Sequence, residues 1–177
     1  MAALSSQQAA REQQPSDQLA SLYSLVHKVV RAGALDRHSR SAELSGRAAL
    51  EAEALFGDES LVVAELRMNE SEALNNLAAT ASGAERDALV RRSWSALLSV
   101  IALLQRRLTT NTLLIGTVRK EESDYFAHVH TVRCAAQNMP SPLPAVVQVR
   151  ASAIGYLVLL DALYRSLNFM FSTLRPL

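Results

Sequence analysis

Cysteine is nearly absent from this chain of 177 residues, in which Cys134 is the only one. A single cysteine excludes an internal disulfide, and the first residues lack the apolar run of a secretory signal. Both features are typical of proteins in a reducing compartment. The sequence therefore predicts a cytoplasmic protein.

Glycine, aromatic residues and net charge are scarce as well. The six glycines are scattered along the chain and cannot form a phosphate-binding glycine loop. Four Phe and one Trp offer few rings on which nucleic-acid bases could stack. The 18 basic residues are balanced by 17 acidic ones, which leaves no strong field to attract nucleic acid or an anionic membrane. We expect neither of these as the partner.

Hydrophobic periodicity predicts an all-α fold. Ala and Leu dominate the composition, and apolar residues recur at helical spacing in six successive segments. These segments cover about residues 16–33, 38–57, 60–81, 84–108, 112–139 and 141–173. Residues 1–15 are rich in Gln, Ala and Ser and are expected to form a frayed or disordered tail. Residues 16–177 are then a single helical domain.

The fourth segment has the most regular apolar stripe of the six. Its members are Val90, Trp94, Leu97, Leu98, Ile101, Leu104 and Leu108. This stripe predicts that the fourth helix is central to the core and that Trp94 is largely buried. On that basis, Ile101→Ala is expected to cost about 2–5 kcal/mol of stability.

Short connections between the segments predict three antiparallel helical hairpins, arranged as a right-handed stack or as a compact bundle. A shift of 52 residues aligns residues 60–74 with 112–126, and four of the fifteen aligned residues are identical. The third and fifth helices are therefore interpreted as equivalent members of successive hairpins in a repeat of about 52 residues.

One stretch is similar to a known family of helical hairpins. Residues 47–57 read Arg-Ala-Ala-Leu-Glu-Ala-Glu-Ala-Leu-Phe-Gly. The acidic residues Asp58 and Glu59 follow, where a new helix is expected to begin, and Leu-Asn-Asn-Leu-Ala stands at 74–78. This pattern resembles tetratricopeptide repeats of the kinesin-light-chain type over roughly residues 47–78. The resemblance implies a scaffold that binds other proteins or peptides through a groove.

Two glutamates interrupt the apolar faces of the repeat. On a helical projection with Leu61 at zero, Glu70 falls at about 180°, inside the apolar face of its helix. The repeat places Glu122 in the same setting, and an arginine precedes each glutamate by three residues, Arg67 and Arg119. These four residues are interpreted either as polar contacts of a groove that binds a peptide or as ion pairs within each helix.

No residue is assigned to catalysis, to a cofactor or to a metal. His128 and His130 diverge by about 200° on a helix and cannot share one ion. His130 and Cys134 lie four apart, but no further cluster completes a four-ligand site. The sequence therefore favours a non-catalytic interaction module that binds a protein or peptide. The alternative is a helical bundle with a small-molecule or enzymatic site around Glu70 and Glu122.

The last segment is apolar on every side at residues 153–160. A membrane span is disfavoured because Asp161 and Arg165 fall near the middle of the segment. We expect instead an exposed apolar patch that mediates self-association or docking to a partner. Its predicted members are Tyr156, Leu159, Leu163, Phe169 and Phe171.

Overall fold

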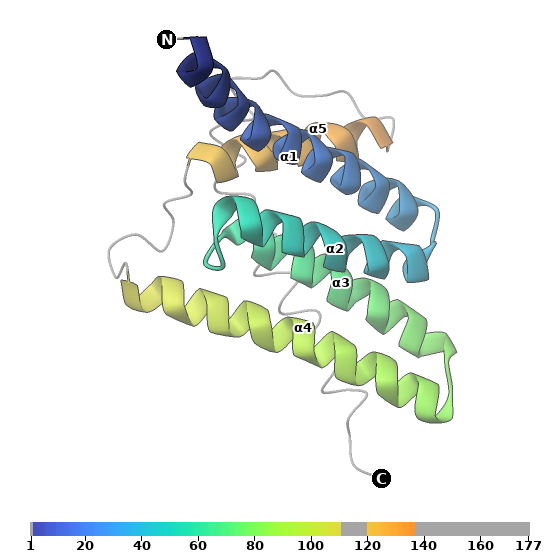
Figure 1. Cartoon of the computed structure of the whole chain (residues 1–177). Helices are drawn as coiled ribbons and strands as arrows, with labels where there is room; N and C mark the ends of the chain where they lie inside the picture. Colours follow the sequence, from blue (N-terminus) through green and yellow to red (C-terminus); the bar gives the residue numbers. More distant parts are fainter. Residues whose placement is uncertain (1, 111–119, 137–177) are drawn as a thin grey trace.

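The computed structural model of the chain describes residues 2–110 and 120–136. This part of the chain consists of five α-helices and contains no strand, so the predicted all-α class is confirmed (Figure 1). The helices are α1 Ala2–Ala34, α2 His38–Phe56, α3 Leu61–Thr80, α4 Gly83–Thr110 and α5 Lys120–Ala136. The predicted sixth helix lies outside the described residues, and so does the predicted patch from Tyr156 to Phe171.

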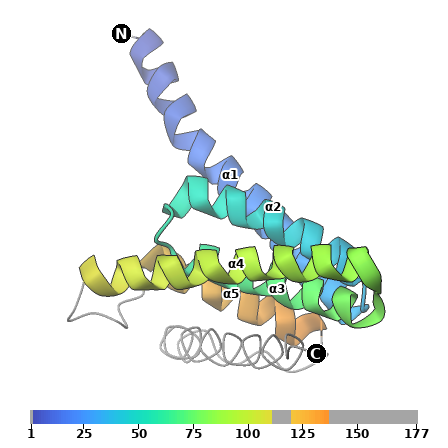
Figure 2. The same cartoon turned by 90° about the horizontal axis from the view of Figure 1, so that it is seen from below.

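The first helix begins earlier than the sequence predicts. It starts at Ala2 instead of near Ser16, so the expected tail is helical. Ala, Gln, Arg and Glu are strong helix formers, and they fill much of this segment. The N-terminal part of α1 projects beyond the other helices (Figure 2).

Local signals explain where the middle helices begin and end. The Ser60 side chain accepts a hydrogen bond from the backbone N–H of Val62 and so caps α3. Gly57 ends α2 with a φ of 86°, a left-handed conformation that a residue without Cβ adopts at little cost. Gly83, with a φ of 56°, allows the sharp turn between α3 and α4.

The first four helices lie side by side in chain order and run antiparallel (Figure 1). α3 is the central helix, because it packs against α2, α4 and α5 and twelve of its 20 residues are buried. α5 packs against α1 and α3 rather than chiefly against α4. The stack of three equivalent hairpins is therefore not confirmed.

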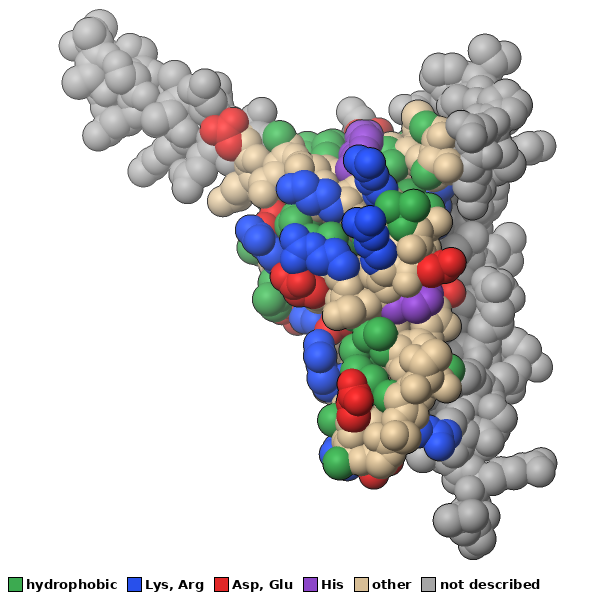
Figure 3. Space-filling view, turned by 90° about the vertical axis from the view of Figure 1, so that its right-hand side faces the viewer, with side chains coloured by type: hydrophobic (Ala, Val, Ile, Leu, Met, Phe, Trp, Pro, Cys, Tyr) green, Lys and Arg blue, Asp and Glu red, His purple; other side chains and the backbone are tan. Residues whose placement is uncertain are grey.

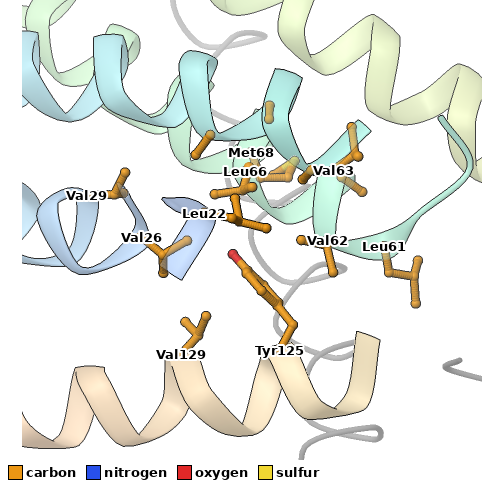
Figure 4. Close-up of a cluster of buried hydrophobic side chains, with 14 of the residues drawn as sticks. Leu22, Val26, Val29, Leu61, Val62, Val63, Leu66, Met68, Tyr125 and Val129 are labelled. Carbon is orange, nitrogen blue, oxygen red and sulfur yellow. The ribbon is translucent and has the colours of Figure 1, made fainter. Parts of the chain in front are cut away.

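The core is built from all five described helices, and α4 contributes Leu97, Val100 and Leu103 to it. Leu22 and Val26 of α1 contact the apolar start of α3 in this cluster, and Tyr125 reaches into it from α5 (Figure 4). All three side chains are buried. Phe126 and Val129 of α5 belong to the same cluster, so several α5 side chains join this helix to the layer of four helices.

The expected role of α4 is wrong in two respects. α4 lies at one edge of the layer, and its buried face is rotated away from the predicted stripe. Leu97 and Val100 are buried, whereas Trp94 and Ile101 are half-buried and Leu98 is 48% exposed. The regularity of an apolar stripe does not reveal which neighbours cover the helix.

Removal of the Leu97 side chain should destabilise the fold more than removal of the Ile101 side chain. Leu97 is 0% exposed, so Leu97→Ala leaves a cavity and should cost about 2–5 kcal/mol. Ile101→Ala removes a half-buried side chain and should cost clearly less. Urea denaturation of both variants measures the difference, and a larger loss for Ile101→Ala would contradict the observed face.

Candidate functional site

Two grooves open at the C-terminal ends of α1 and α5. The inner groove has a volume of about 590 Å³ and lies between α1, the start of α2, the middle of α3 and the end of α5. The outer groove has a volume of about 570 Å³, and its described lining residues come from α1, from Leu35 after it and from α5. Val30, Ala34 and Ala136 line both grooves, so the two hollows adjoin one another.

The inner groove is lined by polar and apolar surface in about equal parts. It is lined by the charged residues Asp36, Glu72 and Arg133, by His38, and by the amides of Asn69 and Asn76. Its apolar floor comes from the C-terminal half of α1 and from Ala73. Such a mixture of apolar surface and a few polar groups is typical of binding sites.

Arg133 is held in the wall of the inner groove by a buried carboxylate. Its Nη2 donates to Oε1 of Glu65 in α3 at 2.8 Å. The Glu65 side chain is 6% exposed, whereas that of Arg133 is 36% exposed. A paired, partly exposed guanidinium is fixed in place and still accessible from the groove.

Tyr125 lies on the inner side of the same ion pair. Burial raises the pKa of its hydroxyl well above the usual value, and the nearby Glu65 carboxylate raises it further. The Tyr125 hydroxyl and Oε2 of Glu65 are both buried. The phenol therefore stays neutral and acts as a core side chain, not as a proton donor to the groove.

Three rings meet between α1 and α5 beside the outer groove: His128 stacks on Tyr23 and lies tilted against His27. The centroid of His128 lies 4.1 Å from that of Tyr23 and 5.2 Å from that of His27. Burial lowers the pKa of His128, and so does the neighbouring His27. Burial raises the pKa of Tyr23, and Asp124 adds to this effect. Both pKa shifts favour the neutral form, that of the His128 ring and that of the Tyr23 ring.

Glu122 caps the central helix and lines neither the inner nor the outer groove. Its side chain is fully buried, and Oε1 accepts a hydrogen bond of 2.9 Å from the backbone N–H of Leu61. Leu61 is the first residue of α3, where unpaired N–H groups and the helix dipole favour an anion. The predicted partner of Glu122, Arg119, lies outside the described residues.

Glu70 forms the ion pair that the sequence predicts. Its Oε2 accepts from Nη1 of Arg67 at 3.0 Å, and Arg92 of α4 approaches Oε1 at 4.0 Å. The Glu70 side chain is 13% exposed and lies against Gly46 of α2, where a Cβ would sit 3.0 Å from Oε1. This close approach fixes the packing of α2 on α3.

The repeat correctly predicts that the side chains of Glu70 and Glu122 are largely buried. It does not reveal that the two glutamates lie at different sites. Neither Glu70 nor Glu122 lines the inner or the outer groove. The N–H that Glu122 caps lies nine residues from Glu70 along α3, which is a rise of about 13 Å. Equivalent positions in the sequence therefore have different partners in space.

The described residues offer no assembled metal site, since no three His, Cys, Asp or Glu side chains gather there. The His130 Nε2 and the Cys134 Sγ approach to 3.7 Å as an isolated pair. Within residues 2–110 and 120–136, no helix is both long enough and apolar enough to cross a bilayer.

Sequence reasoning missed Glu65, Arg133 and the grooves. Glu65 has a detectable signal, because on the projection used for Glu70 it falls at about 40°, between Leu61 and Val62. Its partner Arg133 is 68 residues away, a distance at which no sequence spacing reveals a pair. The grooves depend on where α5 crosses α1, which no local pattern determines.

Comparison of the chain with protein-family models, with curated proteins and with solved structures finds no match. Its function must be inferred from its own residues.

Loss of the Glu122 carboxylate should destabilise the start of α3. Glu122→Ala leaves the buried N–H of Leu61 without this acceptor and should cost about 1–3 kcal/mol. Glu122→Gln retains an acceptor oxygen and should lose less. Urea denaturation measures both losses, and an alanine variant as stable as the parent would show that the cap is dispensable.

Protonation of His128 should weaken the packing of α5 on α1. Its pKa is lower in the folded state than the ordinary value of 6.5, so the unfolded chain binds the proton more tightly. The stability that neutral His128 contributes is fully present above about pH 6.5 and is lost as the pH falls through the folded pKa.

His128→Phe retains a stacking ring that does not titrate. Unfolding free energies measured from about pH 7.5 to 5.5 should fall more steeply for the parent than for this variant. Parallel pH curves for the two proteins would show that protonation of His128 does not contribute to the pH dependence of stability.

Proposed function

We propose that this chain is a non-catalytic interaction module that binds a segment of another protein in the adjoining inner and outer grooves. The observation that carries the proposal is the meeting of the two grooves along one side of α1, at Val30, Ala34 and Ala136. Two adjoining grooves suit an elongated ligand, such as a peptide segment, better than a compact one.

The lining of the grooves supports a peptide as the ligand. Aliphatic side chains of α1 and α5 offer apolar area for anchor residues, while Arg133 and the Asn pair of α3 offer directed hydrogen bonds. Because Glu65 fixes Arg133, less side-chain entropy is lost when that guanidinium binds a carboxylate or carbonyl group.

The tetratricopeptide-like resemblance agrees with such a role, and the repeat remains a prediction. The alternative function, a small-molecule or enzymatic site around Glu70 and Glu122, has less support. Glu70 is engaged by Arg67, and Glu122 is engaged by the start of α3. Self-association through the predicted C-terminal patch also remains a prediction.

The experiment is selection of peptides from a random display library on the full chain, followed by affinity measurement with a blocked variant. Ala34→Trp places a large ring where the grooves meet, at an exposed residue at the end of α1. The selected peptides should bind at least tenfold more weakly to this variant.

Ala79→Trp is the matched control, because Ala79 is also an exposed alanine near a helix end and lines neither groove. It should leave the affinity unchanged. If no peptide is enriched, or if the enriched peptides bind Ala34→Trp as tightly as the parent, the proposed function is wrong.

A further inference from the structure

The outer groove differs from the inner groove in its charge. Among the described residues, the charged side chains that line it are Lys28 and Arg31 of α1, and none of its described lining residues carries a carboxylate. The inner groove instead combines Arg133 with Asp36 and Glu72. The outer groove therefore carries a positive field over an apolar floor, whereas the charges of the inner groove are mixed.

The cations beside the outer groove have no carboxylate partner in the part of the chain that the structure describes. Lys28 and Arg31 are exposed, and neither forms an ion pair among the described residues. Arg37, in the turn that follows α1, is also exposed and forms no ion pair with any described residue. By contrast, Arg40 and Arg47 on α2 are paired with carboxylates of their own helix. Figure 3 shows Lys and Arg side chains gathered over the end of the molecule where α1 meets α2.

The apolar floor lies next to these cations. Val132 and Ala135 of α5 face Val30 and Ala34 of α1 across the groove, and Leu35 at its edge is 52% exposed. Lys28, Arg31 and Leu35 are spaced by three and four residues, which places them along one side of the end of α1. The cations thus form a row that flanks the apolar strip.

We infer that the outer groove binds an acidic amphipathic helix, a partner whose apolar face covers the strip and whose Glu or Asp residues meet Lys28 and Arg31. This inference rests on the proposed peptide-binding function and adds the chemistry of the ligand. Charge complementarity favours an acidic partner, because Lys28 and Arg31 would repel a basic helix. A helix of two to three turns, about 12–15 Å, matches the stretch from His27 to Leu35.

The probes are two synthetic peptides of about sixteen residues. Both carry Leu at helical spacing on one face, one has Glu on both flanks of that face, and the other has Lys at the same positions. The Glu peptide should bind the full chain at least tenfold more tightly than the Lys peptide. Its affinity should fall as salt is raised, because the contacts lie at the surface.

Charge reversal on the protein tests the assigned residues. The double variant Lys28→Glu, Arg31→Glu should bind the Glu peptide at least tenfold more weakly than the parent does. It should bind the Lys peptide more tightly than the parent does. The matched control is Arg86→Glu with Arg91→Glu, two exposed arginines of α4 that line neither groove and form no ion pair among the described residues. Both double variants change the net charge equally, so a difference between them reports position and not total charge.

The outcomes separate this inference from the function on which it rests. The acidic-helix inference is overturned if the two peptides bind equally or if neither binds. It is also overturned if both double variants lose affinity for the Glu peptide to the same extent. The peptide-binding function would still stand if library peptides lose affinity for Ala34→Trp. Reversed preference of the Lys28→Glu, Arg31→Glu variant for the Lys peptide supports the inference and also shows that this variant is folded.

Discussion

The position of α5 depends on two carboxylates that would be costly to bury without partners. Glu122, near the start of α5, accepts the first N–H of α3, and Arg133, near its end, donates to Glu65. Removing either partner would leave a buried polar group or charge without its contact, which is strongly unfavourable. Both contacts therefore select one register of α5 on α3, and Tyr125 fills the core between them. The fixed register also brings His128 onto Tyr23 of α1.

The grooves are a consequence of that register. Val132, Arg133, Ala135 and Ala136 line them because the last turns of α5 lie beside the C-terminal half of α1. One ion pair thus has two effects: it anchors the helix from the inside, and it presents a fixed guanidinium to the inner groove. A binding surface supported by a buried contact is preorganised, which reduces the entropy lost on binding.

Much of the fold follows from the sequence, while the assembly does not. The caps at Ser60 and the turns at Gly57 and Gly83 are local signals, so the middle helices are placed within a few residues. The burial of Glu70 follows from its angular position, and its pair with Arg67 follows from the spacing of three. The role of Glu122 does not follow, because its acceptor function depends on an N–H from a distant helix. The same limit explains why the apolar stripe of α4 predicts the wrong face: the sequence shows the stripe but not the helices that pack against it.

Hydrogen exchange is the most direct test of whether Glu122 holds α5 in place. Amide protection in α5 would be compared between the parent, Glu122→Ala and the exposed control Glu53→Ala, whose side chain forms no hydrogen bond or ion pair among the described residues. Glu122→Ala should lower protection in α5 and in the first turn of α3, while the hydrogen bonds of α2 remain protected. The control should match the parent. Unchanged protection of α5 in Glu122→Ala would contradict the claim that this buried carboxylate determines where α5 lies.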